Sequence, residues 1–286
     1  MKLLNGKKIA DIIKEEIATE IKTIAEKNGR TPGLAVVLVG SDLASEVYVK
    51  LKKRDCKEVG IKSFEHNLPE SCSENELLSL IEQLNNNIEV DGILVQLPLP
   101  DSIDESKVLK SIAPAKDVDG FHPENVGALL QNQAILKPCT PSGTIELLDR
   151  YQIEIEGKNV VVLGRSNIVG KPLAIMMLHR NATVTIAHSK TADIKSVTKQ
   201  ADILCVAIGK SDFLKADMVK EGAVVIDIGV NRKADNSLTG DVDFEQVTKV
   251  ASYVTPSPGG IGPLTRAMLL KNSLIAYKMN ITNLAR

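Results

Sequence analysis

Residues 160–172 read Val-Val-Val-Leu-Gly-Arg-Ser-Asn-Ile-Val-Gly-Lys-Pro, and this stretch decides the fold. An apolar, β-branched run stops at Gly164, a polar turn follows, and Gly170 and Pro172 suit the first turn of a helix. In a Rossmann unit, a strand, a tight glycine turn and a helix N-terminus in this order present backbone N–H groups to a pyrophosphate. We therefore predict a dinucleotide site here; the alternative is a helix-capping turn in an α/β unit that binds nothing.

The glycine turn departs from the usual dinucleotide pattern at one position. It reads G-x-S-x-x-x-G rather than G-x-G-x-x-G, and Ser166 stands where the second glycine usually lets the backbone approach phosphate. We therefore expect the cofactor to sit slightly differently from its place in a standard Rossmann unit.

Strand and helix patterns alternate on both sides of this stretch, which favours parallel sheets with helical crossovers. Strands are predicted at residues 33–40, 61–68, 91–100, 159–164, 182–187, 202–208, 223–228 and 252–255. Helices are predicted at residues 9–28, 41–59, 74–87 and 263–278. A link at residues 138–143, in which Ser142 is predicted to cap the next helix, separates the two halves. The expected fold is two α/β domains flanking a cleft, with a Rossmann-type parallel sheet in the C-terminal one.

Composition excludes several classes of protein. The 286 residues are enough for about two domains, and a net charge of -1 without a long basic tract argues against nucleic acid as a partner. No apolar run reaches the length of a membrane span, and the N-terminal residues lack the apolar core of a signal peptide, so we expect a cytoplasmic protein. Neither the four cysteines nor the four histidines have metal-ligand spacing, so we predict free thiols and no bound metal.

The residues after the second strand of the Rossmann half indicate the type of dinucleotide. NAD-binding units usually carry an acidic residue there, but this chain has His188-Ser189-Lys190, and Arg165 in the glycine turn lies close enough in the expected fold to reach the same place. Cations and hydroxyl donors suit a 2′-phosphate, so the pattern favours NADP over NAD. The alternative is that His188 and Lys190 are solvated loop residues.

Candidate reacting groups lie in the first half. Tyr48 and Lys52 are four residues apart on a predicted helix and share a face; a buried lysine of this kind can exchange protons, although a lysine on a charged helix is usually solvated. Gln96 is a polar residue in an apolar strand, either a structural hydrogen-bonding group or a site residue. Asp117 and Asp119, in a predicted loop, have three open roles: binding a metal, capping a helix or holding a substrate.

Five motifs in order along the chain resemble the methylenetetrahydrofolate dehydrogenase/cyclohydrolase family. They are Tyr48-Val49-Lys50-Leu51-Lys52, the segment 91–99 (DGILVQLPL), the segment 116–120 (KDVDG), the glycine turn 164–170 and the segment 258–265 (PGGIGPLT). The family usually has an apolar residue where Ser257 stands, a difference that bears only on fine packing.

The resemblance implies a bifunctional enzyme. It would oxidise 5,10-methylenetetrahydrofolate to the 5,10-methenyl form with NADP and hydrolyse that product to 10-formyltetrahydrofolate. It also implies a homodimer formed through the cofactor domain. The implied domains are 1–138, joined by the C-terminal helix at about 264–286, and 139–263 for NADP.

The resemblance also implies roles for individual residues. Lys52 would be the general acid/base, Tyr48 would orient it, Gln96 would hydrogen-bond it, and Asp119 would accept paired N–H donors of the pterin. Substrate contacts are implied for Tyr48, Lys52, Val95, Gln96, Leu97, Asp119, Pro258, Gly259 and Gly260. Cofactor contacts are implied for Gly164, Arg165, Ser166, Ile168, Gly170, His188, Ser189 and Val230.

Two other functions fit the motifs less completely. One is an NADP-dependent dehydrogenase for a folate or another small metabolite, without a hydrolytic step. The other is a dinucleotide-binding protein without catalysis, which would have no need of Lys52, Gln96 and Asp119 together.

Overall fold

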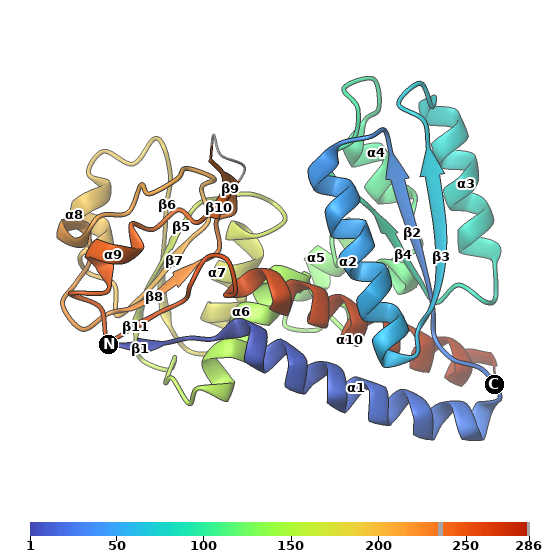
Figure 1. Ribbon diagram of the computed structural model, residues 1–286, viewed down its shortest axis with the longest axis horizontal. Helices are drawn as coiled ribbons and strands as arrows, with labels where there is room; N and C mark the ends of the chain where they lie inside the picture. The colour runs from blue at the N-terminus through green and yellow to red at the C-terminus, as the bar shows by residue number, and fades with distance from the viewer. Residues whose placement is uncertain (234–236, 285–286) are drawn as a thin grey trace. The chain divides into compact units, whose positions relative to one another are not determined.

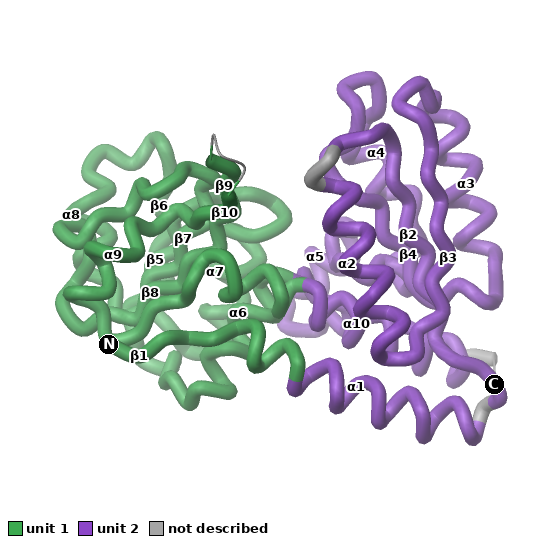
Figure 2. The backbone as a smooth tube through the Cα atoms, in the orientation of Figure 1, with its two compact units in different colours: residues 1–11, 140–265 green, residues 12–139, 266–286 purple. Residues whose placement is uncertain are grey.

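The computed structural model describes residues 1–233 and 237–284, which form two compact units (Figures 1 and 2). Unit 1 contains residues 1–11 and 140–265, and unit 2 contains residues 12–139 and 266–286, of which 285–286 lie outside the described residues. Two long helices, α1 (Gly6–Asn28) and α10 (Ile261–Leu284), have residues in both units.

Unit 1 is built on a parallel six-stranded sheet with the order β1-β11-β8-β7-β5-β6. Its strands are β1 (Lys2–Leu3), β5 (Asn159–Leu163), β6 (Thr183–Ala187), β7 (Ile203–Val206), β8 (Val224–Asp227) and β11 (Tyr253–Val254), and β9 (Asn231–Arg232) and β10 (Leu238–Thr239) form a separate antiparallel pair. Its helices are α6 (Cys139–Arg150), α7 (Gly170–Leu178), α8 (Ile194–Thr198), α9 (Phe244–Val247) and the 3₁₀ helix η2 (Ala216–Met218).

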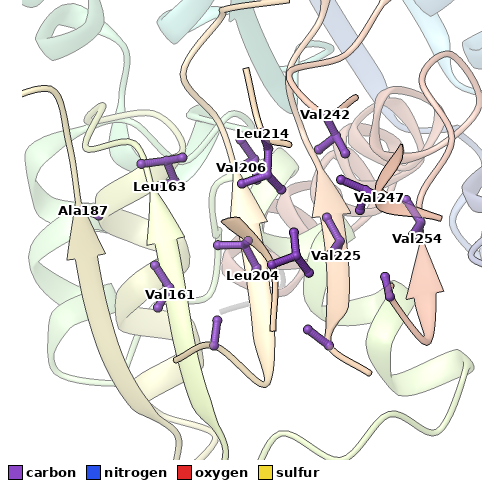
Figure 3. Close-up of a cluster of buried hydrophobic side chains, with 14 residues drawn as sticks. Val161, Leu163, Ala187, Leu204, Val206, Leu214, Val225, Val242, Val247 and Val254 are labelled. Carbon is purple, nitrogen blue, oxygen red and sulfur yellow. The ribbon is translucent and has the colours of Figure 1, made fainter. Parts of the chain in front are cut away.

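Alternate residues of these strands build the core on one face of the sheet (Figure 3). Val161 and Leu163 on β5 lie beside Leu204 and Val206 on β7, and Val225 on β8 continues the row. Side chains in a strand point alternately to opposite faces, so the β-branched run of the sequence fills both sides of a sheet that is covered on both faces. The buried sheet gives the glycine turn after β5 a rigid base.

Unit 2 has a parallel three-stranded sheet with the order β3-β2-β4. The strands are β2 (Gly33–Val39), β3 (Lys62–Leu68) and β4 (Gly92–Val95), and the further helices are α2 (Leu43–Val59), α3 (Glu74–Asn86), α4 (Glu105–Ser111), η1 (Pro114–Lys116) and α5 (Pro123–Leu130). β2 is central and all seven of its residues are buried, which explains its continuous apolar sequence. A core cluster joins β2 and β4 to Leu77 and Ile81 of α3.

The structure differs from the sequence predictions in three places. Residues 1–11 belong to unit 1 rather than to the expected domain 1–138, because Lys2 and Leu3 pair with Tyr253 and Val254 at the sheet edge. The link at 138–143 is instead the start of α6, so Ser142 lies within the helix and does not cap it. The sequence analysis also did not predict several short elements, each of eight residues or fewer: the helices α4, α5, α8 and α9 and the strands β9 and β10.

Candidate active site

Lys52 lies on α2 and reaches the end of β4. The helix begins after Asp42, whose side chain accepts the N–H of Ser45, and ends at Gly60 in the left-handed conformation. Lys52 Nζ donates a hydrogen bond to Gln96 Oε1 at 2.9 Å. Gln96 Nε2 in turn donates to the carbonyl of Leu97 at 2.7 Å, which fixes the amide so that its oxygen faces the lysine.

Burial shifts the pKa values of Lys52 and Asp119. Desolvation lowers the pKa of Lys52, and the charge of Asp119 acts in the opposite direction. Desolvation also raises the pKa of Asp119 to about 6, while Lys52 pulls it down. The pair is therefore poised so that both groups titrate nearer to neutral pH than they would in water, as acid–base chemistry requires.

Cys139 is part of the same cluster, although the sequence analysis gave it no role. Burial raises the pKa of its thiol well above the ordinary value, with Asp119 acting in the same direction. The Cys139 thiol donates to the carbonyl of Val118 at 3.3 Å. A neutral thiol beside Asp119 is a packing and hydrogen-bonding group, and only the fold reveals its proximity.

Asp117 and Asp119 have separate environments, which narrows the alternatives that the sequence left open. The Asp117 carboxylate accepts the backbone N–H of Gly120 at 3.1 Å and of His122 at 2.8 Å, and the side-chain amide of Asn125 at 2.8 Å. Asp117 therefore shapes the loop before α5. Asp119, by contrast, has a carboxyl group whose pKa burial raises and the charge of Lys52 pulls down.

Residues of α10 in unit 2 support this cluster, and the sequence analysis did not identify them. Asn272 Nδ2 donates to the carbonyl of Val118 at 2.7 Å and to that of Lys137 at 2.8 Å, the residues next to Asp119 and near Cys139. Arg266 Nε donates to Asp55 Oδ2 at 2.6 Å, and this ion pair gives a cationic partner to a carboxylate that is only 1% exposed. These contacts join residues that are more than a hundred positions apart, so no local pattern announces them.

Close approaches between backbone segments shape the glycine turn of unit 1. A Cβ on Gly164 would lie 2.2 Å from the carbonyl oxygen of Ala207, and one on Gly170 would lie 2.3 Å from that of Gly164. Ser166 Oγ accepts the N–H groups of Val169 and Gly170 at 3.2 Å each, which closes the turn that leads into α7. The close approach of three backbone segments therefore requires both glycines.

Arg165 and the His188 turn follow the ends of paired strands. Leu163 pairs with Ala187, so the residues just beyond them emerge at the same edge of the sheet. His188 Nδ1 accepts the backbone N–H of Lys190 at 3.2 Å. The backbone N–H of His188 donates to Thr191 Oγ1, and the two bonds together close a tight turn. Arg165, Ser189 and Lys190 are exposed there. The structure thus brings cationic and hydroxyl groups to adjacent strand ends, as the sequence analysis expected of a 2′-phosphate site.

Gly260 and its neighbours form a fixed turn within unit 1. Lys7 N–H donates to the carbonyl of Gly259 at 3.0 Å, and a Cβ on Gly6 would lie 1.9 Å from the carbonyl oxygen of Gly260. Gly259 has a φ of 102°. The implied substrate contacts of Pro258, Gly259 and Gly260 stay predictions.

The other predicted residues differ in exposure. Tyr48 is partly buried one helical turn from Lys52, and Leu97 is partly buried after β4. Val95 is 3% exposed and packs in the core of unit 2, so its side chain contributes packing. Val230 is 46% exposed and Ile168 is partly buried in unit 1. Their binding roles remain predictions.

Within residues 1–233 and 237–284, no group of three or more His, Cys, Asp or Glu side chains is arranged to hold a metal ion. Of the helices described in the structure, none is both long and apolar enough to span a membrane.

Comparison with known protein families shows which family the chain belongs to. Residues 4–119 match the profile of the tetrahydrofolate dehydrogenase/cyclohydrolase catalytic domain, and residues 138–281 match that of its NAD(P)-binding domain. The chain belongs to the tetrahydrofolate dehydrogenase/cyclohydrolase family. The catalytic-domain match includes Lys52, Gln96 and Asp119, and the NAD(P)-binding match includes the glycine turn.

Individual relatives of the tetrahydrofolate dehydrogenase/cyclohydrolase family agree over nearly the whole chain. The bifunctional protein FolD of Ruminiclostridium cellulolyticum is 58% identical over 272 residues, 95% of each chain. The crystal structure of the bifunctional FolD enzyme of Campylobacter jejuni is 50% identical, with a TM-score of 0.96 over 98% of this chain and 99% of that one. The Trypanosoma brucei enzyme, whose structure is a complex with NADP and an inhibitor, is 37% identical with a TM-score of 0.95 over 98% of each chain.

Proposed function

We propose that this protein oxidises 5,10-methylenetetrahydrofolate with NADP and hydrolyses the resulting 5,10-methenyltetrahydrofolate to 10-formyltetrahydrofolate. Its membership of the family supports both steps. The observation that carries the proposal is the hydrogen bond of 2.9 Å from Lys52 to Gln96, beside an aspartate whose pKa is raised to about 6. A protein that only bound a dinucleotide would not need this partly buried proton-exchanging cluster.

The oxidation step needs positioning rather than proton transfer. A hydride leaves the methylene carbon of the folate for the nicotinamide and leaves a cation that the adjacent nitrogens stabilise by resonance. Unit 1 would supply the cofactor site, and the Gly164–Gly170 turn between β5 and α7 would meet the pyrophosphate. Arg165, His188 and Ser189 would hold the 2′-phosphate.

The hydrolysis step needs proton transfer, and Lys52 has the position and the lowered pKa for it. Water adds to the methenyl carbon and loses one proton to give a hydroxyl group. The bond from that carbon to N5 then breaks as the hydroxyl group loses its proton to become the formyl C=O and N5 takes up a proton, so one proton is released overall. Gln96 accepts the Lys52 ammonium N–H and orients the amine. Tyr48 lies one turn before Lys52 on α2 and would help to orient it.

Asp119 is the proposed anchor of the pterin ring. Its carboxylate would accept two parallel N–H donors, a charge-assisted pair that fixes both the distance and the plane of the ring. Val95, Gln96 and Leu97 would border the folate at the end of β4.

One assay with purified protein, NADP and 5,10-methylenetetrahydrofolate tests the proposed function. Reduced cofactor and the methenyl intermediate are followed together by absorbance. We expect reduced cofactor to form with little build-up of the methenyl form. Stoichiometric methenyl accumulation would overturn the hydrolytic half, and the absence of reduced cofactor would overturn both halves.

Assembly and location complete the proposal. The protein forms a homodimer through unit 1, where Leu238 of β10 and Phe244 of α9 are 42% and 38% exposed apolar side chains that an interface would bury. It is a cytoplasmic protein, in keeping with Cys56, Cys72, Cys139 and Cys205, which are all free and buried thiols. Light scattering coupled to size-exclusion chromatography tests the dimer, and a monomer at micromolar concentration would contradict it.

A further inference from the structure

Two buried aspartates hold the loops that follow β7 and β8. Asp227 is the last residue of β8 and is 4% exposed; Asp241 follows β10 and is fully buried. Neither belongs to the residues that the family motifs of the sequence analysis singled out. Buried carboxylates are costly unless donors satisfy them, so the partners of these two groups show what they hold in place.

Asp241 collects donors from two loops. Its carboxylate accepts three consecutive backbone N–H groups, those of Ile208 at 2.7 Å, Gly209 at 3.0 Å and Lys210 at 2.7 Å. It also accepts Asn231 Nδ2 at 2.8 Å. One side chain therefore fixes the loop after β7 to the segment after β8.

Asp227 fixes Asp241 itself. The Asp227 carboxylate accepts the N–H groups of Asp241 at 2.9 Å, Val242 at 3.1 Å and Gly229 at 3.1 Å. Burial raises the pKa of Asp227 to about 7 against these hydrogen bonds.

Two glycines make the arrangement of these carboxylates sterically possible. A Cβ on Gly229 would lie 2.1 Å from Asp241 Cγ, and a Cβ on Gly240 would lie 1.7 Å from Asp227 Oδ2. Each carboxylate thus occupies the space that a side chain would need on the opposite loop. The two aspartates and the two loops therefore hold one another in place through close packing and hydrogen bonds.

The sheet order tells which part of the cofactor these loops would meet. Ligands of parallel α/β sheets bind beyond the carboxyl ends of the strands. β7 and β8 are neighbours on one side of β5, whereas β6, followed by His188 and Ser189, is at the edge on the other side. If the 2′-phosphate lies beyond β6, the nicotinamide half of NADP extends beyond β7 and β8, where Val230 is exposed.

We propose that Asp241 is a positioning residue that holds the loops 208–210 and 229–231 in the shape that receives the nicotinamide half of NADP. The inference rests on the proposed cofactor site and deepens it, because it assigns the determinants of the two cofactor halves to different strand ends. Asp241 acts through the backbone of these loops and is not itself a contact of the reacting atoms.

The test uses the full-length Asp241→Asn variant, which keeps the size of the side chain but places an amide N–H₂ opposite N–H donors. Three quantities are compared with the unsubstituted protein: the Kd of NADP, the Kd of 2′,5′-ADP, which lacks the nicotinamide half, and hydrolysis of added methenyltetrahydrofolate without cofactor. We expect the Kd of NADP to rise at least tenfold while the other two quantities change less than twofold. A purely structural defect would lower the affinity for both nucleotides equally, and this outcome would overturn the inference, as would an unchanged Kd of NADP.

Two more variants keep the test decisive. Asp243→Asn is the matched control, because Asp243 follows two residues later but caps α9 and pairs with Lys215; its Kd of NADP should be unchanged. Asn231→Ala removes one of the four donors to Asp241 and replaces Asp241→Asn if that variant does not fold; it should raise the Kd of NADP severalfold, and no change would overturn the inference. If the unsubstituted protein binds neither NADP nor 2′,5′-ADP, the proposed cofactor site fails, and this inference fails with it.

Discussion

The candidate sites of the two units are built from different groups, backbone in unit 1 and side chains in unit 2. In unit 1 the candidate site is made of backbone: glycines at 164 and 170 allow three segments to approach, and a helix begins at the turn. In unit 2 the candidate site is made of the side chains of Lys52, Gln96 and Asp119, and burial shifts the pKa values of the lysine and the aspartate. Backbone groups bind but do not titrate, so we expect substitutions in unit 2 to remove chemistry and substitutions of unit 1 side chains to adjust affinity.

The largest expected effect tests the side-chain site of unit 2. Lys52→Met keeps the length of the chain but removes the exchangeable proton, so cyclohydrolase activity should fall by at least about a hundredfold, the range of lost general acid–base catalysis. The dehydrogenase step should survive, because hydride transfer needs no proton acceptor. The measurement is the rate of hydrolysis of added methenyltetrahydrofolate beside the rate of cofactor reduction.

Lys53→Met is the matched control for Lys52→Met. Lys53 is the next residue on α2, is 61% exposed and pairs with Glu65 on the surface, so its loss should leave both rates within about twofold. Hydrolysis by Lys52→Met at the unsubstituted rate would remove Lys52 from the mechanism.

The next effect concerns a side chain of the backbone-built site. Arg165→Ala should raise the KM for NADP roughly ten- to a hundredfold, the scale of a lost hydrogen bond to a charged group, and leave the KM for NAD nearly unchanged. Kinetics with both cofactors make the comparison. Arg180, which pairs with Asp149 in the same unit, provides the control variant Arg180→Ala. An equal loss with NADP and NAD would refute the assignment of Arg165 to the 2′-phosphate.

A smaller effect follows from the pKa of Asp119, which burial raises to about 6. The carboxyl group is charged above this pH and neutral below it, and only the charged form accepts two N–H donors of a pterin. The KM for methylenetetrahydrofolate in the dehydrogenase step should therefore rise about tenfold for each pH unit below this value and level off above it.

Asp119→Asn separates the contribution of Asp119 from other titrations. The variant should bind the folate weakly, and its KM should no longer depend on pH in this range. A KM that keeps the full pH dependence in Asp119→Asn would assign the titration to another group.

The difference between the units also explains what could be predicted from sequence. The strands of unit 1 and the Gly164 turn were predictable because each signal is local: a β-branched run, a glycine where the chain turns, and a proline in the first turn of a helix. β1 was missed because two residues have no periodicity and their partner, β11, is some 250 positions away. Ser142 was predicted to cap a helix because serine is a common N-cap residue, but α6 already begins at Cys139, and Pro141 is tolerated in its first turn.

The site of unit 2 was predictable only in part. The sequence pattern made Lys52 and Gln96 candidates and the resemblance implied their roles, and the hydrogen bond between them is present. The sequence did not reveal the residues around them. The fold brings Cys139 beside Asp119, and Asn272 of α10 donates a hydrogen bond to the carbonyl of Val118, the residue before Asp119. Burial and electrostatic coupling arise from contacts between distant segments, and a sequence pattern does not record them.

The smallest effect tests where this chain departs from its family. Ser257, in place of the usual apolar residue, donates to the carbonyl of Gly229 at 3.3 Å, which links the Pro258 turn to the loop after β8. The bond is long and Asp227 already holds that loop through Gly229 N–H, so Ser257→Val should change stability by less than about 1 kcal/mol. The KM for NADP should change less than about twofold, the scale of a substitution outside the main contacts. Thermal unfolding and cofactor kinetics measure both. A KM raised fivefold or more would show that the Ser257 side chain, like that of Asp241, helps to set the shape of the cofactor site in unit 1.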